Sequence, residues 1–256
     1  MSSHIVDKHS IYYKAVYQNY DWMFDKYIIN GMTEQEIADL CGASLRVIKK
    51  WCCEKFRLNN RTKKYLIKLN SIQKDLVIGN ILGDGHITKG DAPMFIVSHT
   101  ESQKEYLYWE YGIMKNLCLS PPSYYDGEYK YIKGKPAYTK PSYRFGTVKI
   151  CQLKEFNDLS IKEVIDPLNN MSLSIFMLDD GYYSSSMLWE LCVASFSEEE
   201  RDYFIRVLYN KFGIKSKKKK DSRYIVFNRY YSDIINNIII SSIPNNIDII
   251  KTKLRI

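Results

Sequence analysis

Two short apolar runs in this 256-residue chain each end in an Asp-Gly pair. They are residues 77–85 (VIGNILGDG) and residues 173–181 (LSIFMLDDG). Each run can form about two turns of buried helix, and its glycine can take the left-handed conformation that ends a helix. Asp84 and Asp180 then lie at helix C-termini, where the helix dipole disfavours a carboxylate. A carboxylate and free carbonyl oxygens at one point suit a hard divalent cation, so both positions are candidate metal sites.

The two runs belong to an internal repeat. Asp84 and Asp180 are 96 positions apart, and the segments that follow them match at the same offset. Strand-like residues 95–100 correspond to 191–196, and the helical patterns after them also correspond. One copy alone would favour a plain buried helix followed by a turn. The repeated order of helix, Asp-Gly, strand and helix instead predicts two related halves about a pseudo-twofold axis.

The composition favours a polyanionic partner. The net charge is +8 and the pI is about 9.0, which fits nucleic acid better than an anionic membrane surface. We expect no membrane association, because no apolar run has the length of a spanning helix, and the N-terminus has no secretion-signal pattern. Six cysteines without a Cys-x-x-Cys pair argue against zinc. We therefore expect reduced thiols in a cytoplasmic compartment, in a bacterial or phage-infected cell, or in an organellar matrix.

Residues 32–51 have the pattern of a helix-turn-helix. Thr33 and Glu36 form a capping box, Gly42 supplies the tight turn, and Ser44 can cap the second helix. That second helix would offer its basic residues to the major groove: Arg46, Lys49 and Lys50. The alternative is a helical hairpin with a solvated basic face. We expect a helical domain over residues 1–65 that ends in a basic connector.

Two basic hairpins are predicted in the remainder. Residues 128–132 and 137–150 read as strands around a Lys-Gly-Lys turn, with tyrosines and basic residues alternating. A second cluster of lysines falls near the tip of a hairpin in the second half. The candidate DNA contacts are Lys130, Lys133, Lys135 and Arg144 in the first half, and Lys217, Lys218 and Lys219 in the second. Plain solvated hairpins are the alternative.

These features together resemble the LAGLIDADG homing endonucleases, and most of all their single-chain, two-motif branch (omega-intron endonuclease-like). The resemblance covers about residues 72–256. It is strengthened by residues 119–122 (LSPP), 171–173 (MSL) and 195–199 (SFSEE). The helix-turn-helix region has no counterpart in the omega enzyme.

The resemblance implies an α+β fold. Two αββαββα halves, about residues 72–168 and 169–256, would form a DNA-binding saddle, preceded by the small all-α helix-turn-helix domain. The motif helices would pack against each other on the pseudo-twofold axis. Ile175 stands where the first motif has Gly79, so their crossing is not symmetric.

The resemblance also implies a site for divalent metal. The final aspartates, Asp84 and Asp180, would bind Mg²⁺ or Mn²⁺ with the help of the Gly83 and Asp179 carbonyls, and Ca²⁺ would support binding without cleavage. A basic residue in each half would stabilise the phosphate. The candidates are Lys149 in the first half and Lys219 or Lys220 in the second.

The expected function is that of a Mg²⁺-dependent, site-specific DNA endonuclease of intron homing. It would cut both strands of double-stranded DNA with short 3′ overhangs and act as a monomer. Two alternatives use the same fold: a DNA-binding transcriptional regulator, and an RNA maturase that binds its own intron RNA. The presence of both Asp84 and Asp180 favours the enzyme, because a pure binder could lose these carboxylates.

Overall fold

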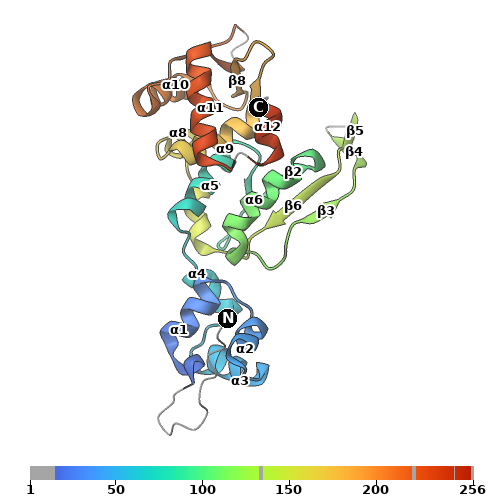
Figure 1. The fold of residues 1–256 in the computed structure, drawn as a ribbon, viewed down its shortest axis with the longest axis vertical. Helices are drawn as coiled ribbons and strands as arrows, with labels where there is room; N and C mark the ends of the chain where they lie inside the picture. The colour runs from blue at the N-terminus through green and yellow to red at the C-terminus, as the bar shows by residue number, and fades with distance from the viewer. Residues whose placement is uncertain (1–14, 133–134, 221–222, 245, 255–256) are drawn as a thin grey trace. The chain divides into compact units, whose positions relative to one another are not determined.

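The computed structural model describes residues 15–132, 135–220, 223–244 and 246–254 (Figure 1). The chain divides into two compact units, one up to Ile67 and one from Lys68 onward. None of the helices in these ranges is long and apolar enough to cross a bilayer. Lys133, a predicted DNA contact, lies outside the described residues.

The N-terminal unit is helical. Its elements are η1 (Val16–Gln18), α1 (Tyr20–Phe24), η2 (Asp25–Ile29), α2 (Glu34–Cys41), α3 (Leu45–Lys49), η3 (Lys50–Lys55) and α4 (Asn60–Leu66). The predicted capping box of Thr33 and Glu36 is present, and Gly42 ends α2 with a left-handed φ of 60°. Ser44 caps α3, as predicted. The local geometry of a helix, a glycine turn and a second capped helix is therefore confirmed.

The second unit begins with the first half of the repeat. This half contains α5 (Ser71–Leu82), β1 (His86–Ile87), β2 (Phe95–Thr100), α6 (Lys104–Met114), β3 (Ser123–Tyr125), β6 (Ser142–Gly146), α7 (Lys154–Asn157) and α8 (Ile161–Ile165). A capping box of Asn70 and Gln73 starts α5. Short 3-10 turns at Glu101–Gln103, Lys115–Leu117 and Cys151–Leu153 join these elements.

The second half repeats the same order. It contains α9 (Asn170–Asp180), β7 (Gly181–Tyr183), β8 (Trp189–Cys192), α10 (Glu198–Phe212), β9 (Ser216–Lys218), β10 (Tyr224–Phe227), α11 (Arg229–Ser242) and α12 (Asp248–Leu254). The capping box of Ser197 and Glu200 starts α10, and Gly213 ends it with a φ of 67°.

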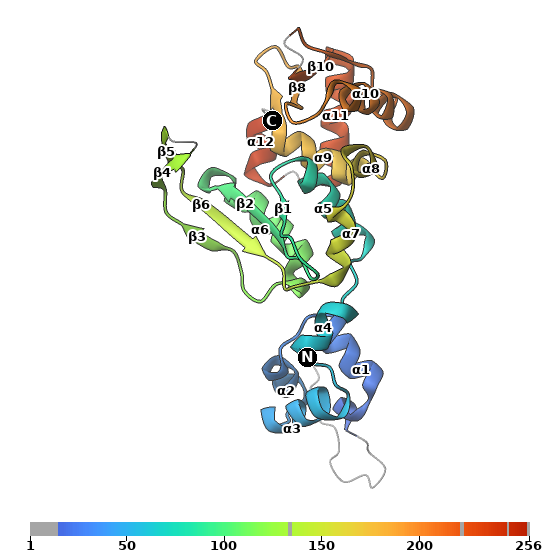
Figure 2. The same ribbon diagram turned by 180° about the vertical axis from the view of Figure 1, so that it is seen from behind.

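The two antiparallel sheets have the same topology. Their strand orders are β1-β2-β6-β3 and β7-β8-β10-β9, so each strand has a counterpart in the other half. Each half thus contains helix, two strands, helix, two strands and helix. The α+β fold with αββαββα halves is confirmed, and Figure 2 shows α5 and α9 between the two sheets.

The first basic hairpin is shorter than the sequence indicated. β4 (Glu128–Ile132) pairs with β5 (Lys135–Thr139), with Ile132 opposite Lys135. The prediction of one strand over 137–150 is wrong, because β6 leaves the hairpin and pairs with β2 and β3. Pro141 lies between β5 and β6, and its missing N–H suits a break in strand pairing.

Helices α5 and α9 pack closely because one of them carries glycine at the contact. A Cβ added to Gly79 would lie 2.7 Å from Ile175 Cβ and 2.8 Å from the Ser172 carbonyl oxygen. Gly79 and Ile175 are also equivalent positions of the repeat. The predicted asymmetry of the helix crossing therefore arises from a complementary pair, in which the small residue lies on one helix and the large residue on the other.

Replacing Gly79 by alanine tests this contact. We expect Gly79→Ala to lower the free energy of unfolding by about 1–3 kcal/mol, because the added methyl group overpacks a backbone contact. Urea unfolding measures the change. Gly112→Ala in α6 is the matched control, because nothing lies within 4 Å of its Cβ. Helix propensity should leave that variant unchanged or up to about 1 kcal/mol more stable. Equal effects at the two positions would contradict the packing role.

Candidate metal centre at the paired helix ends

The side chain of Asp179 crosses from the second half into the first. Its Oδ2 accepts a hydrogen bond from the Asp84 N–H at 3.1 Å, and its Oδ1 accepts one from the Tyr106 hydroxyl at 3.2 Å. The sequence analysis gave Asp179 a carbonyl role alone, so this carboxylate is an addition to the site. Gly83 makes room for it, because a Cβ there would lie 2.4 Å from Asp179 Oδ2.

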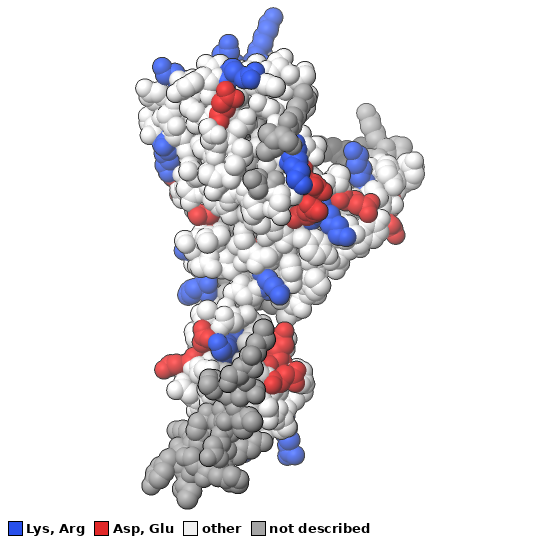
Figure 3. Space-filling view, in the orientation of Figure 1, with Lys and Arg blue, Asp and Glu red and all other residues white. Residues whose placement is uncertain are grey.

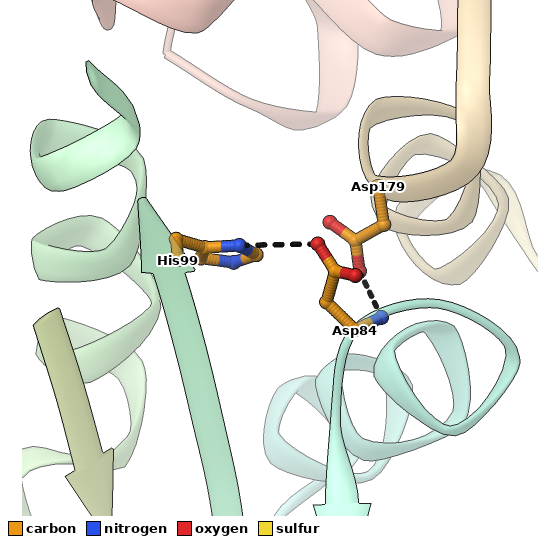
Figure 4. A group of neighbouring side chains, drawn as sticks. All are labelled: Asp84, His99 and Asp179. Atoms are coloured by element: carbon orange, nitrogen blue, oxygen red, sulfur yellow. Dashed lines mark hydrogen bonds and ion pairs between the residues drawn. The ribbon is translucent and has the colours of Figure 1, made fainter. Parts of the chain in front are cut away.

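A buried polar network lies behind Asp84. His99 on β2 places Nδ1 3.3 Å from Asp84 Oδ2 (Figure 4). Its Nε2 lies 2.9 Å from Glu110 Oε2 on α6. Asn80 Nδ2 donates to the other Glu110 oxygen at 2.7 Å. This network was not predicted from the sequence. The available signal was a histidine at an inward position of a strand, 11 positions before a glutamate on the covering helix.

The carboxylates at this point are costly without a cation. Burial, with the charges of Glu110 and Asp84 adding to it and that of His99 opposing it, raises the pKa of Asp179 to about 8. Burial and then the Asp84 charge raise the pKa of Asp180 to about 6. Burial lowers the pKa of His99, but the Glu110 charge and the Asp84 contact outweigh it and raise the value to about 10.

A lysine from the C-terminal helix completes the site. Lys253 on α12 donates to the carbonyl oxygens of Leu178 and Gly181, the latter at 2.9 Å, where α9 ends. Burial lowers the pKa of Lys253, while the charges of the three aspartates oppose that shift. The sequence analysis missed Lys253, since nothing in the local sequence connects it to a motif 72 positions earlier.

The lysines predicted as catalytic are exposed in the described structure. Lys149 is exposed between β6 and α7. Lys219 ion-pairs with Glu190 at 2.7 Å, and Lys220 is exposed after β9. In the part of the chain that the structure describes, the cation that acts on the pKa of Asp180 is Lys253.

The first sheet has one covered face and one open face. Residues of β2 alternate strictly between buried and half-buried, and α6 packs on β2 and β6. Arg144 is exposed on the other face, with its guanidinium 4.9 Å from the Tyr125 ring. Lys130 and Lys135 belong to the hairpin strands β4 and β5. Figure 1 shows this hairpin projecting beyond the end of the sheet.

The lysines of β9 in the second sheet point to opposite faces of the sheet, because side chains alternate along a strand. Lys218 ion-pairs with Glu198 and Asp202 of α10, so it faces the covering helix. Lys217 is exposed and precedes it by one residue, so its side chain points to the opposite face. On the face of the molecule drawn in Figure 3, basic side chains lie singly, with acidic ones among them.

The N-terminal unit also exposes its predicted basic residues. Arg46, Lys49 and Lys50 are exposed on α3 and at the start of η3. Ile48 between them is buried, so the helix has an apolar face toward its own core and a basic face toward solvent.

Comparison with known proteins identifies the family. A model of the LAGLIDADG DNA endonuclease family matches residues 74–234, which is more than half of the chain. The chain belongs to the LAGLIDADG DNA endonuclease family. It is 27% identical over 150 residues to the DNA endonuclease I-ChuI of Chlamydomonas applanata, which covers 52% of this chain and 69% of that protein.

A solved structure shares the fold. The homing endonuclease I-WcaI bound to its DNA recognition sequence matches with a TM-score of 0.59 at 21% identity. The match covers 73% of this LAGLIDADG chain and 87% of that one. The resemblance inferred from the Asp-Gly motifs is confirmed.

Stability should depend on pH and on divalent cations at this site. A carboxyl group whose pKa is higher in the folded state binds more protons when folded, so stability falls as pH rises through that window. For Asp180 the window runs from 3.8 to about 6, and for Asp179 it extends to about 8. The raised pKa of His99 acts in the same direction, between 6.5 and about 10.

We therefore expect the Tm in EDTA to fall between about pH 4 and pH 8. Asp180→Asn should make the fall below about pH 6 shallower, while the contribution of Asp179 remains up to about pH 8. Added Ca²⁺ should raise the Tm more at the upper end of the range, because it offsets ionised carboxylates. Scanning calorimetry measures both effects. A Tm that is flat across the range in the wild type and in the variant would contradict the assignment.

Proposed function

We propose that this protein is a site-specific homing endonuclease that cuts both strands of a long double-stranded DNA target and leaves short 3′ overhangs. The observation that carries the proposal is the pair of aspartates, Asp84 and Asp180, at the C-terminal ends of the two packed motif helices. Membership of the DNA endonuclease family supports it. The repeat supplies two half-sites in one chain, so we propose that one chain acts on each target.

The residues present fit a divalent cation. The carboxylates of Asp84 and Asp179 lie together, and Asp180 is close enough for the Asp84 charge to raise its pKa. The raised pKa values of Asp179 and Asp180 reflect unfavourable charge in a buried place. We propose that Asp84 and Asp180 hold Mg²⁺ or Mn²⁺, aided by the Gly83 and Asp179 carbonyls. Such an ion would lower the pKa of a bound water and stabilise the leaving oxygen of the scissile phosphate.

We assign the basic role in the second half to Lys253. Its ammonium group is held at the end of α9 by two carbonyl oxygens and lies among the aspartates. A fixed positive charge in a partly buried site interacts strongly with charge that develops on a phosphate. Lys149, Lys219 and Lys220 remain candidates for contacts with the DNA backbone.

The open sheet faces and the N-terminal unit supply the DNA contacts in this proposal. Arg144 in the first sheet and Lys217 in the second are exposed on open faces. Arg46, Lys49 and Lys50 would extend the contact to one side of the cut, since the helix-turn-helix occurs once and the nuclease halves occur twice. Their contacts with phosphates would make binding steeply dependent on salt.

Replacing either motif aspartate tests the function. Asp84→Asn and Asp180→Asn should each reduce cleavage by about 10²-fold or more, because each removes a charged metal ligand. DNA affinity in Ca²⁺ should change far less, because it depends mainly on contacts to the phosphate backbone. The assay follows cleavage of target-bearing plasmid in Mg²⁺, with the target taken from selection on a random library.

Asp75→Asn on α5 is the matched control and should cleave like the wild type. Cleavage that survives both motif substitutions would place the active site elsewhere. Tight sequence-specific binding without cleavage by the wild type in any divalent ion would favour the transcriptional regulator.

A second substitution tests the lysine. Lys253→Met should slow cleavage about 10²-fold, because it removes a fixed charge that stabilises the transition state. DNA affinity in Ca²⁺ should fall little. The Tm in EDTA should fall, because two carbonyl oxygens lose their donor and the aspartates lose a positive charge. Lys251→Met on the same helix is the control, because Lys251 is exposed and pairs with Asp248 on the surface. Equal rates for the two variants would exclude Lys253 from the chemistry.

A further inference from the structure

Three potential ligand atoms meet at one point in the first half. One ring nitrogen of His99 and one carboxylate oxygen each from Asp84 and Asp179 all lie within 4.8 Å of one another. Figure 4 shows the imidazole and the two carboxylates directed toward a common space. Ligand atoms of a single ion lie up to about 4 Å apart, since each is about 2.1 Å from the metal. Small side-chain rotations would therefore bring all three onto one ion.

The facing nitrogen of His99 has no hydrogen bond within the described residues. Its Nδ1 is a buried atom, and the whole side chain is 0% exposed. The Nδ1 atom is 3.3 Å from Asp84 Oδ2, which brings the two into ion-pair range without the alignment of a hydrogen bond. A buried polar atom without a hydrogen bond is unfavourable. A metal ion between His99 and Asp84 would replace the proton on Nδ1 and would satisfy both groups.

The other nitrogen of His99 has the partner that metal-bound histidines have. Its Nε2 lies 2.9 Å from Glu110 Oε2, and both side chains are fully buried. Asn80 holds the second Glu110 oxygen at 2.7 Å. A carboxylate behind a histidine fixes the ring orientation and directs the opposite nitrogen toward the metal. The chain from Asn80 through Glu110 to His99 thus positions Nδ1 at the end of α5.

The fold itself does not require this network. At the same offset of 96 in the sequence, the second half has Phe176, Ser195 and Arg206 at the positions of Asn80, His99 and Glu110. Ser195 lies in the turn after β8, whereas His99 lies within β2. Phe176 packs against Phe196 and Phe204 with ring centroids 5.8–6.1 Å apart, and Ser195 and Arg206 are exposed. An apolar cluster therefore fills the equivalent core. The polar network of the first half serves the site.

We propose that His99 Nδ1 is a ligand of the ion at Asp84, with Asp179 as a third ligand, and that this centre prefers a transition-metal ion to Mg²⁺. The proposal rests on the proposed function in one respect, that Asp84 holds a metal ion. Imidazole suits transition metals, whereas Mg²⁺ prefers oxygen ligands throughout. Residues 169–256 contain no histidine, so the centre at Asp180 has no imidazole from its own half and the two centres of one chain differ in metal preference.

Pulsed EPR of bound Mn²⁺ tests the nitrogen ligand in the full chain. Protein with ¹⁵N-labelled histidine should show ¹⁵N coupling to one Mn²⁺, and His86→Gln should leave it unchanged, because His86 is exposed on β1. His99→Gln should abolish the coupling and lower the affinity for that Mn²⁺ ion by about tenfold or more. The affinity for Mg²⁺ should change by less than about threefold. The absence of coupling in the wild type, or its persistence in His99→Gln, would overturn the proposal.

A second variant covers the case in which His99→Gln does not fold. Glu110→Gln keeps the volume and the imidazole, so the nitrogen coupling should persist while Mn²⁺ binds about tenfold more weakly. Unchanged Mn²⁺ affinity in Glu110→Gln would contradict the positioning role of Glu110.

Asp84→Asn separates the two proposals. Mn²⁺ that depends on Asp84 but shows no nitrogen coupling would refute the role of His99 and leave the endonuclease assignment standing. If Asp84→Asn changed neither Mn²⁺ binding nor cleavage, the metal centre itself would be refuted.

Discussion

The contact between α5 and α9 is the constraint on which the rest of the second unit depends. On a pseudo-twofold axis, equivalent residues of the two halves meet each other, and two pairs do so here: Gly79 with Ile175, and Gly83 with Asp179. In each pair one half supplies glycine and the other supplies the side chain that fills the space. This complementarity lets the helix backbones approach closely enough for their C-terminal ends to share one site. Both sheets are attached directly to these helix ends, so the helix contact also sets the position of the sheets.

The close approach of α5 and α9 brings negatively charged groups together, and the two halves offset this charge with different residues. Three aspartates are gathered where two helix dipoles also end, and the raised pKa values of Asp179 and Asp180 reflect it. The first half places the buried His99–Glu110 pair behind Asp84. The second half brings Lys253 from α12 to the end of α9. The two halves therefore share a backbone topology but differ in the polar groups that surround each carboxylate.

The sequence predicted what depends on local pattern and on the repeat. Asp84, Asp180, the helix-turn-helix caps and the order of elements follow from capping residues, periodicity and the offset of 96. It could not show that the Asp179 side chain enters the opposite half, because that depends on the helix crossing. Lys253 reaches the site through tertiary packing alone. Lys217 and Lys218 could have been separated by strand alternation, which puts adjacent residues on opposite faces.

The Gly79–Ile175 pair also bears on why the two halves are joined. In a symmetric dimer, each residue on the axis meets its own copy, so the pair would be two glycines or two isoleucines. Two glycines would leave a gap and two isoleucines would overlap, and both cost stability. A fused chain can place a small residue on one helix and a large one on the other. The same holds for Gly83 with Asp179, where two aspartates on the axis would add charge to a site already rich in it. The two helix faces are therefore complementary to each other within one chain, and neither would pack as well against its own copy.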